Sequence, residues 1–167
     1  MKKDHILRNK RAPRSLDELD LRILAALQRD ARITNVALAE AVHLSPAPVY
    51  RRVQELEAAG VIRNYVTLLD PDALGLGVSM FISVSLDKQV DSALRAFEAR
   101  IADYPEVMEC YLMTGESDYL LRVVARDLKS LTALITDRLA RIPNVASIRS
   151  SLALKQVKYQ TALPLDH

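Results

Sequence analysis

Apolar residues recur at helical spacing in the first 60 residues of the chain. The first stripe, which runs from a capping box of Ser15 and Glu18 to Asp30, consists of Leu19, Ile23, Leu24 and Leu27. Apolar residues at this spacing lie on one side of a helix and face a core. The pattern therefore predicts a first helix that packs against its neighbours.

Two further helices are expected close behind the first. One begins after Thr34, a suitable N-cap, and lasts about two turns. The other begins after Ser45, also a suitable N-cap, with Pro46 at its first position and an end at Ala59, because Gly60 stops it. Two helices joined by so few residues have the spacing of a helix-turn-helix, whose second helix lies in the major groove of DNA.

Helical phase sorts the side chains of the third helix into an inner and an outer set. With Val49 as the buried reference, Val53 and Leu56 lie within about 40° of it at about 100° per residue, so they pack inward. The residues that point away are Ala47, Arg51, Gln54 and Glu55. Arg51 and Gln54 have the donor geometry to read the edges of guanine and adenine respectively.

The flanks of this helix complete the expected DNA contacts. Pro48, Tyr50 and Arg52 lie where they reach sugar or phosphate, and Ser45 with the free N–H groups of the helix start suits a phosphate. All candidate DNA contacts together are Thr34, Asn35, Ser45, Pro46, Ala47, Pro48, Tyr50, Arg51, Arg52 and Gln54. The alternative is that Arg51, Arg52 and Gln54 merely solvate an exposed helix face, but the caps, the short turn and the following segment favour DNA binding. That segment, residues 61–70, is rich in β-branched and aromatic residues and predicts an extended wing or connector strand.

From residue 78 the apolar pattern changes from helical to alternating, which is typical of a strand with one buried face. Strands and helices are then expected over residues 78–86, 91–103, 107–113, 119–125, 128–141 and 145–154. The order βαββαβ, with similar segments after the two helices, predicts a ferredoxin-like fold. Two helices cover one face of such a sheet, so a homodimer that packs sheet on sheet would cover the other.

The segment between the second and third strands is the candidate ligand site. Its residues are Met113, Thr114, Gly115, Glu116, Ser117, Asp118 and Tyr119. Gly115 permits a tight backbone path, the N–H groups beside it suit a carboxylate, and Asp118 suits an ammonium group. Those are the two ends of an amino acid. The alternative is a hairpin loop in which Gly115 and Asp118 satisfy turn chemistry alone.

The composition is that of a globular protein, with 50% apolar and 26% charged residues among 167. No apolar run of about 18 residues occurs, and the first residues lack the apolar core of a signal peptide. We therefore expect a cytoplasmic protein that does not enter the membrane. The single cysteine, Cys110, makes no internal disulfide and is expected to be a small buried hydrophobe.

Charge is distributed unevenly along the chain. Residues 1–66 carry 12 basic and 8 acidic groups, whereas residues 67–167 carry 11 and 13. Most of the excess comes from Lys2, Lys3, Arg8, Lys10, Arg11 and Arg14. This tail is either an arm for DNA phosphates or a solubilising tail. Because residues 16–66 hold 6 basic and 7 acidic groups, the prediction of DNA binding rests on caps, phase and motif rather than on bulk charge.

Several motifs, taken in order, carry a resemblance to a known family. They lie at residues 16–24, 30–36, 44–48, 52–53, 57–62, 114–115 and 118–121. Over residues 16–155 the chain resembles the leucine-responsive/AsnC (Lrp/AsnC) family of bacterial and archaeal transcriptional regulators. The resemblance implies a winged helix-turn-helix and a ferredoxin-like (RAM/AsnC-type) domain that dimerises and builds tetramers or octamers. It also implies a small amino-acid effector near residues 115–118, between dimers.

Two departures from the family pattern concern the DNA-binding helices. His43 stands where many members have glycine, at a turn position expected to require positive φ, which histidine tolerates better than a β-branched residue does. Val49, Tyr50 and Arg51 differ from the more frequent residues of the recognition helix. The resemblance therefore transfers the DNA-binding mode but not an operator sequence.

The sequence thus predicts an α+β protein. Its expected parts are a basic tail (1–15), a winged helix-turn-helix domain (16–66), a linker (67–77), a ferredoxin-like effector-binding and oligomerisation domain (78–158) and a C-terminal tail (159–167). The expected function is sequence-specific transcriptional regulation, with double-stranded DNA, a small amino acid and further copies of the chain as partners. The alternative is an architectural protein that wraps DNA without an effector. We expect no catalytic residue, metal site or other cofactor, since no motif for metal-assisted hydrolysis or phosphate binding occurs.

Overall fold

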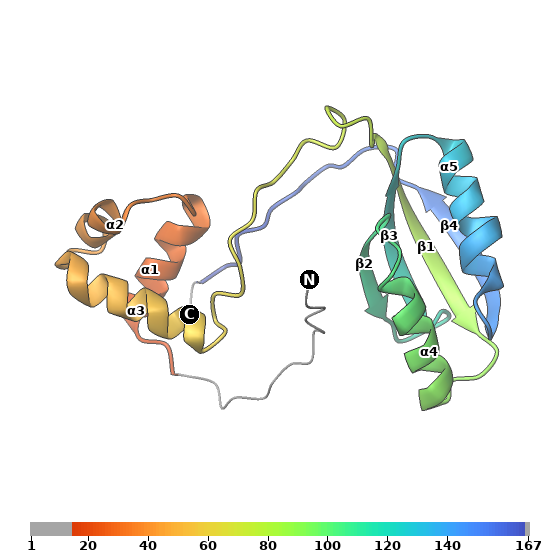
Figure 1. Cartoon of the computed structure of the whole chain (residues 1–167), viewed down its shortest axis with the longest axis horizontal. Coiled ribbons are helices and arrows are strands. Elements are labelled where there is room, and N and C mark those ends of the chain that lie inside the picture. The colour runs from red at the N-terminus through yellow and green to blue at the C-terminus, as the bar shows by residue number, and fades with distance from the viewer. Residues whose placement is uncertain (1–14, 166–167) are drawn as a thin grey trace. The chain divides into compact units, whose positions relative to one another are not determined.

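The structure is a computed structural model that describes residues 15–165. The predicted contacts of the basic tail lie outside the described residues. The chain forms two compact units. One runs to Thr67 and includes the C-terminal residues from Lys158, and the other spans Leu68–Val157 (Figure 1).

The described residues of the first unit form the helices α1 (Glu18–Arg29), α2 (Asn35–Ala41) and α3 (Pro46–Ala58). Their buried apolar side chains form one core of Ile23, Ala26, Leu38, Ala39, Val42, Val49 and Leu56. The helical stripes predicted from the sequence are therefore the core-facing sides. In the turn before α3, His43 has φ of +58°, which confirms the expected positive φ at this position.

The predicted cap of α1 is wrong by two residues. The N-cap is Asp17 rather than Ser15, because the Asp17 side chain accepts the Asp20 N–H at 2.8 Å and the Asp20 side chain accepts the Asp17 N–H at 3.3 Å. The chain contains both patterns, and the aspartate pair forms the capping box. Helix α1 consequently begins at Glu18, with two carboxylates at its start.

Residues 61 and 62 form a bend after α3 and residues 63–70 have no regular secondary structure, so the predicted strand is absent from the described chain. A run of β-branched and aromatic residues becomes a strand only when a neighbouring backbone completes the hydrogen-bond ladder. One side chain of this connector returns to α3, where the Tyr65 hydroxyl donates to Glu57 at 2.9 Å. Burial and this carboxylate raise the pKa of Tyr65 to about 12.

The C-terminal residues belong to the helical unit through a contact that the sequence did not predict. The side-chain amide of Gln28, at the end of α1, donates to the Leu163 carbonyl at 3.1 Å. It also accepts the Leu163 N–H at 2.6 Å. The Gln28 amide thereby makes the pair of hydrogen bonds that a neighbouring backbone would make, and it attaches the C-terminal segment to α1.

The second unit has the predicted order βαββαβ. Its elements are β1 (Val78–Leu86), α4 (Asp91–Ile101), β2 (Val107–Leu112), β3 (Tyr119–Ala125), α5 (Leu128–Ala133) and β4 (Val145–Leu152). The strands form one antiparallel sheet in the order β2-β3-β1-β4. This is the ferredoxin-like arrangement expected from the sequence.

One face of the sheet forms the core of this unit. Alternate residues of β1 and β3, such as Ile82, Val84 and Leu121, are fully buried and pack with Phe97 of α4 and Leu131 of α5. The residues between them face the other way. Both helices therefore cover the same face of the sheet.

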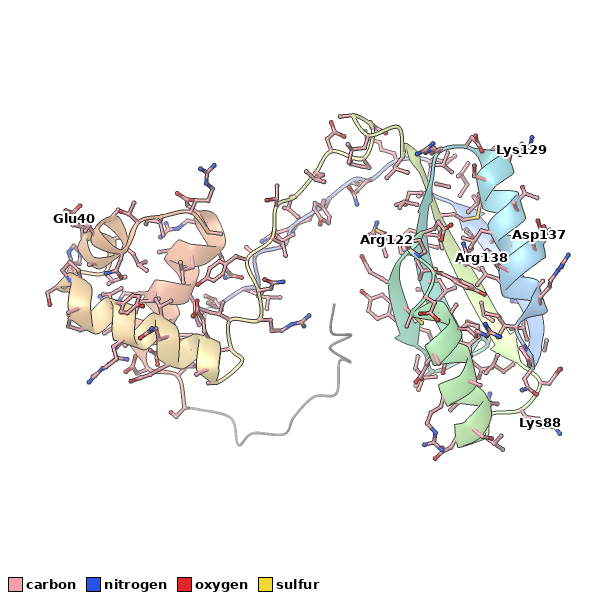
Figure 2. All side chains as sticks on the ribbon, in the orientation of Figure 1. Glu40, Lys88, Arg122, Lys129, Asp137 and Arg138 are labelled. Atoms are coloured by element: carbon pink, nitrogen blue, oxygen red, sulfur yellow. The ribbon has the colours of Figure 1, made fainter. Side chains whose placement is uncertain are left out.

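The opposite face carries a mixture of serine, apolar and charged side chains. Phe81 of β1 lies there, 40% exposed, in register with Arg122 of β3. The guanidinium of Arg122, which is labelled in Figure 2, contacts Glu109 of β2 at 2.6 Å. The Tyr111 hydroxyl donates to the same carboxylate at 2.7 Å. Within the described chain, no helix covers this face.

Residues 128–141 are helical throughout, as predicted, but the α-helical part, α5, ends at Ala133. After α5 the chain widens into a π-helical turn, Leu134–Arg138, and ends in a 3₁₀ turn, Leu139–Arg141. Arg138 closes the widened turn, with its guanidinium 4.0 Å from the centre of the Tyr104 ring and 2.8 Å from Glu106 (Figure 2). Helical periodicity alone does not reveal such a turn, because the apolar stripe continues through it.

Candidate nucleic-acid interface and ligand loop

The buried side chains of α3 fix the orientation of the helix about its own axis. Val49 and Leu56 are fully buried in the helical core, and Val53 packs against them. This confirms the inner set that the helical phase predicted. Since the three lie on one stripe, Arg51 and Gln54 are left on the outer side, where both are exposed.

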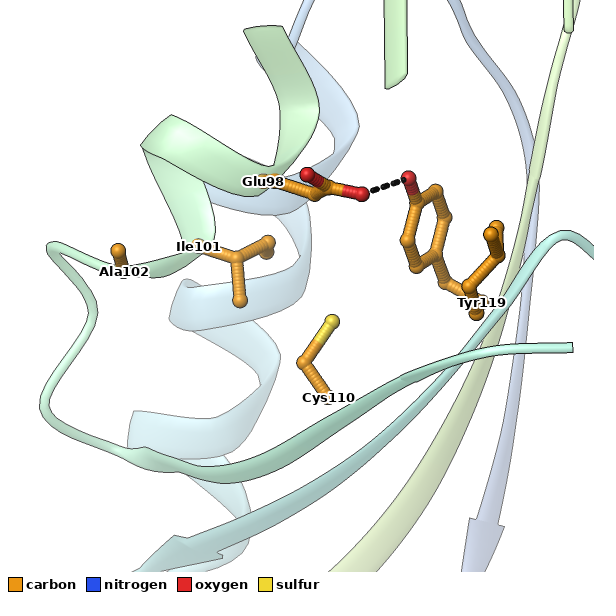
Figure 3. A pocket seen from close by; sticks show the side chains of 6 residues that line it. Glu98, Ile101, Ala102, Cys110 and Tyr119 are labelled. Carbon is orange, nitrogen blue, oxygen red and sulfur yellow. Dashed lines mark hydrogen bonds between the residues drawn. The ribbon is translucent and has the colours of Figure 1, made fainter. Parts of the chain in front are cut away.

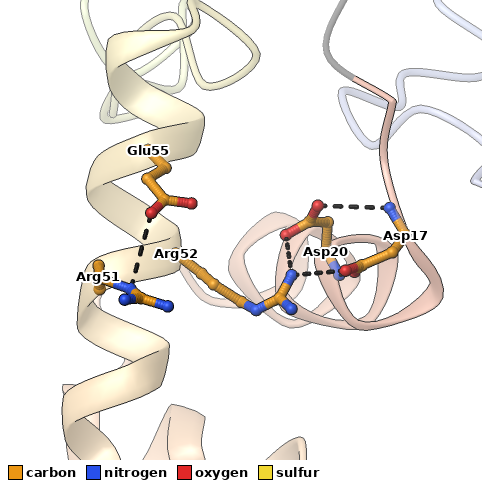
Figure 4. A network of polar contacts seen from close by, with 5 residues as sticks. All are labelled: Asp17, Asp20, Arg51, Arg52 and Glu55. Carbon is orange, nitrogen blue, oxygen red and sulfur yellow. Dashed lines mark hydrogen bonds and ion pairs between the residues drawn. The ribbon is translucent and has the colours of Figure 1, made fainter.

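A second anchor holds the flank of α3 against the start of α1. Arg52 Nη1 lies 2.7 Å from Asp17 Oδ2 and 2.9 Å from Asp20 Oδ1 (Figure 4). Asp20 is only 1% exposed, so its carboxylate is satisfied largely within the protein. The sequence suggested a phosphate contact for Arg52, but its guanidinium here joins α3 to the capping box of α1.

The same cluster lowers the pKa of the Asp17 carboxyl. The main cause is the hydrogen bond from the Asp20 backbone N–H, and the Arg52 guanidinium adds to it. The two carboxylates in turn raise the pKa of Arg52. Asp17 and Arg52 are thus both charged at neutral pH.

The starts of α2 and α3 are joined to each other. Thr34 caps α2, since its hydroxyl accepts the Ala37 N–H at 3.2 Å. The Asn35 side chain donates to the Pro46 carbonyl at 2.9 Å, which ties α2 to the first turn of α3. Ser45 is the N-cap residue of α3, as predicted, but its hydroxyl makes no capping hydrogen bond. The residues at this helix start, from Ser45 to Pro48, are all exposed.

The exposed side of α3 holds two side-chain pairs, and the two residues of each pair lie one helical turn apart. Arg51, whose side chain is 77% exposed, lies 3.7 Å from Glu55 (Figure 4). Gln54 Nε2 donates to the Tyr50 hydroxyl at 2.9 Å. The arginine pair is long and exposed, so it leaves the Arg51 guanidinium available to another acceptor.

The loop between β2 and β3 is held at its two ends. The Met113 N–H donates to the Asp118 carbonyl at 2.8 Å, and the Asp118 N–H donates to the Val84 carbonyl at 3.0 Å. Between these bonds Gly115 has φ of +120°, a conformation that favours glycine. Within the described residues, the N–H groups of residues 114–117 have no protein acceptor. The loop therefore presents a run of backbone donors, as the sequence suggested.

The carboxylate of Asp118 faces inward rather than toward the loop surface. Asp118 is 9% exposed, and its two oxygens accept the Leu86 N–H and the Gln89 side-chain amide, both at 2.7 Å. It thereby holds the end of β1 and the chain after it against the loop. The exposed carboxylate of the loop is Glu116, which lies 3.2 Å from Arg149 of β4.

Tyr119, the last residue of the predicted ligand site, also turns away from the loop. Its ring packs against Phe97 with centroids 4.5 Å apart, and its hydroxyl donates to Glu98 at 2.9 Å (Figure 3). Burial and Glu98 raise its pKa. The structure thus places Thr114, Gly115, Glu116 and Ser117 together at the surface, and it separates Tyr119 from them.

A hollow of about 230 Å³ lies under the end of α4. It is lined by Glu98, Ile101, Ala102, Cys110, Leu112 and Tyr119 (Figure 3). Cys110 is therefore not the buried core residue that the sequence predicted, because it lies on the exposed edge strand β2. Desolvation of the thiol in the hollow, together with Glu98, raises its pKa to about 11, so the thiol stays protonated at neutral pH.

Among residues 15–165, no helix has the length and apolar character that crossing a bilayer requires. A compact helix-turn-helix with an exposed second helix, joined to a ferredoxin-like unit with a loop of free donors, defines a DNA-binding regulator with a ligand-binding domain.

Comparison with known proteins identifies the family. A model described as winged helix-turn-helix DNA-binding matches residues 16–63, and the Lrp/AsnC ligand binding domain matches residues 79–163. The chain belongs to the Lrp/AsnC family of transcriptional regulators. The family match confirms the resemblance predicted from the sequence motifs.

Individual relatives support the same assignment. The Bkd operon transcriptional regulator of Pseudomonas aeruginosa is 47% identical over 150 residues, covering 90% of this chain and 98% of its own. The leucine-responsive regulatory protein of Rhizobium meliloti is 47% identical over 143 residues, covering 86% and 92%. A solved transcriptional regulator of Neisseria meningitidis, in complex with L-methionine, is 41% identical with a TM-score of 0.87, covering 92% and 99%. All three are regulators.

Proposed function

We propose that this regulator reads a specific DNA sequence with the outer side of α3, and that a small amino acid bound at residues 113–118 controls it. The observation that carries the DNA-binding proposal is the fixed rotation of α3. Val49 and Leu56 point into the core, and Arg52 is tied to α1, so Arg51 and Gln54 are directed outward together. A recognition helix whose rotation is set before binding presents its reading residues without rearrangement.

Contacts to bases and to the DNA backbone are divided between different residues. Arg51 reads guanine and Gln54 reads adenine, since their side chains match the acceptors and donors of those bases in the major groove. Ser45, with its uncommitted hydroxyl, and the first N–H groups of α3 hold a phosphate. Thr34 and Asn35 position the start of α2 beside them. Pro46, Ala47 and Pro48 approach the DNA along the exposed first turn.

The reading role of Arg51 is tested with Arg51→Ala and a matched control, Arg22→Ala, an exposed arginine of α1. Sites are first selected from random duplexes with the wild-type protein. Arg51→Ala is expected to lose about 1 to 3 kcal/mol of affinity for the selected sites and little for random DNA. Arg22→Ala is expected to bind like the wild type. An equal loss of affinity on both kinds of DNA would contradict base reading by Arg51.

The effector proposal rests on the run of free N–H groups at residues 114–117. Convergent backbone donors suit the carboxylate of an amino acid. Glu116 is the better candidate for the ammonium group, because Asp118 is buried and already accepts hydrogen bonds on both oxygens. A further support is the related Neisseria meningitidis regulator, which was solved with L-methionine.

Calorimetric titration with each of the twenty amino acids tests the effector proposal. A ligand that binds the folded state also raises the melting temperature by mass action. Glu116→Gln is expected to weaken the response, whereas Glu40→Gln, on an exposed part of α2, is the matched control. If no amino acid binds at millimolar concentration, the effector-independent alternative, an architectural protein that wraps DNA, is favoured instead.

Control by the effector requires a second state, and we propose that assembly supplies it. A second copy covers the face of the sheet that carries Phe81, Tyr111 and the Arg122–Glu109 pair. Such a dimer matches a two-fold DNA site, and the effector shifts its assembly or DNA geometry only if it binds the two states unequally. Phe81→Asp is expected to yield monomers in light-scattering measurements. An unchanged mass would place the contact elsewhere.

A further inference from the structure

Tyr50 and Gln54 form a side-chain pair on the outer side of α3. They lie one helical turn apart, and Gln54 Nε2 donates to the Tyr50 hydroxyl at 2.9 Å. Tyr50 is 56% exposed, so this bond is at the surface that would meet DNA rather than in the core. Tyr50 also lines a shallow hollow of the helical unit, together with Leu38, Val53 and Tyr65.

This bond fixes the orientation of the Gln54 amide. A glutamine side chain has two N–H donors and one carbonyl acceptor. With one N–H held by Tyr50, the second N–H and the carbonyl oxygen remain as an adjacent donor and acceptor. Adenine presents the complementary pair in the major groove, an acceptor at N7 and a donor at N6.

We propose that Tyr50 is a positioning residue for base reading, which holds the Gln54 amide in the orientation that accepts adenine. The inference rests on the proposed reading role of α3 and specifies one base position within it. Tyr50 then acts through Gln54, whereas the sequence alone suggested a contact to sugar or phosphate. A glutamine that is ordered before binding loses less side-chain freedom when it meets the base, so discrimination improves.

The two roles of Tyr50 predict different measurements. A hydroxyl that contacts phosphate contributes to all DNA, because the backbone carries no sequence information. A hydroxyl that orients Gln54 contributes only where Gln54 meets its base. The discriminating quantity is therefore the preference for adenine at one position of the site, measured beside affinity for random DNA.

The experiment uses the full-length protein and duplexes selected from a random library. The affinities of the selected site, its single-base variants and random DNA are measured for the wild type, Tyr50→Phe, Gln54→Ala and the double variant. Tyr159→Phe, an exposed tyrosine of the C-terminal segment, is the matched control. A duplex with 7-deazaadenine at the position read by Gln54 removes the N7 acceptor.

Tyr50→Phe is expected to reduce the preference for adenine about three- to tenfold and to leave binding to random DNA unchanged. Gln54→Ala is expected to abolish the preference for adenine, and 7-deazaadenine should no longer change the affinity of this variant. In the Gln54→Ala background, Tyr50→Phe should have no further effect on the preference. Tyr159→Phe is expected to behave as the wild type. Circular dichroism checks that each variant is folded.

Three results would overturn the inference. An equal loss on selected and random DNA in Tyr50→Phe would assign the hydroxyl to phosphate. An unchanged preference in Tyr50→Phe, or additive effects in the double variant, would show that the pair does not act as a unit. If the wild type selects no sequence from the library, both the role of Tyr50 and the proposed reading function fail. The first two results leave the reading function intact, so failure of the inference and failure of the proposed function are distinguishable.

Discussion

The DNA-binding helix and the ligand loop are built in different ways. Helix α3 owes its orientation to side chains, through the buried Val49 and Leu56 and through the Arg52 pair with Asp17 and Asp20. The ligand loop owes its shape to the backbone, through the hydrogen bonds at its ends and the positive φ of Gly115. One site presents side chains on a rigid element, and the other presents N–H groups on a turn.

This difference teaches that charged residues beside a site are of two kinds, those that hold the fold and those that stay exposed. The charged groups next to the reading surface, Arg52 and Asp20, hold the fold of the helical unit. In the other unit Asp118 does the same, while Glu116 of the same loop is exposed. Proximity to a site therefore does not make a residue part of it, and stability measurements should separate anchors from contacts.

The largest expected effect comes from removing the core that orients α3. Leu56→Ala deletes a fully buried side chain and should destabilise the helical unit by about 3 kcal/mol, with loss of DNA binding near its melting temperature. Leu121→Ala is the counterpart in the sheet core of the other unit. Hydrogen exchange measured at increasing urea concentration should show that each substitution lowers the unfolding free energy of the unit that contains it. Equal weakening of both units by one variant would contradict their separate stability.

The next largest effect separates two adjacent arginines. Arg52→Met removes the hydrogen bond and ion pair between the Arg52 guanidinium and the buried Asp20 and should cost about 2 kcal/mol of stability. Arg51→Met removes only a long, exposed pair and should change stability by less than about 0.5 kcal/mol. Specific DNA binding should follow the reverse order when each variant is measured well below its melting temperature. If folded Arg52→Met lost specific DNA binding while Arg51→Met bound normally, Arg52 rather than Arg51 would be the DNA contact.

Much of this comparison was predictable from the sequence, because it depends on local periodicity. Helical phase identified the inner and outer sides of α3, Thr34 and Ser45 marked the helix starts, and alternation identified the strands. The positive φ of His43 followed from its place in the turn. These features depend on residues within a few positions of one another.

The features that were missed depend on partners distant in sequence. The Ser15 and Asp17 caps fit the local pattern equally well, and Arg52, 35 residues away from Asp17, engages only the latter. Asp118 is turned inward by Gln89, 29 residues away, and Leu163 meets Gln28 across 135 residues. Such contacts carry no periodic signal, so only the folded chain reveals them.

A smaller effect is expected at the ligand loop. Asp118→Asn keeps the shape of the side chain but weakens the acceptors for the Leu86 N–H and Gln89, so it should destabilise the sheet unit by about 1 to 2 kcal/mol. Glu116→Gln, which is exposed, should leave stability within about 0.5 kcal/mol. Thermal unfolding without ligand measures both. If Glu116→Gln proved the more destabilising variant, the division between anchor and ligand contact would be reversed.

The smallest effect concerns acid, and it involves one helix cap in each unit. Asp17 caps α1 and Asp127 caps α5, where its carboxylate accepts the Ser130 N–H at 2.6 Å. The pKa of each carboxyl is lowered, mainly by the backbone hydrogen bond that it accepts from Asp20 or Ser130. Between the folded and unfolded pKa values the unfolded state binds more protons, so stability rises with pH.

The stabilisation by each cap is therefore complete above the ordinary aspartate pKa and is lost as the pH falls through the lowered folded value. Asp17→Asn should flatten the acid dependence of the helical unit alone, and Asp127→Asn that of the sheet unit alone, in urea unfolding between pH 5 and pH 2. Because Asp17 also contacts Arg52, Asp17→Asn should remove more of the pH-dependent stability of its unit than Asp127→Asn removes from the other. A steeper acid loss in either variant, or the same change in both units, would show that the caps are not the groups that titrate.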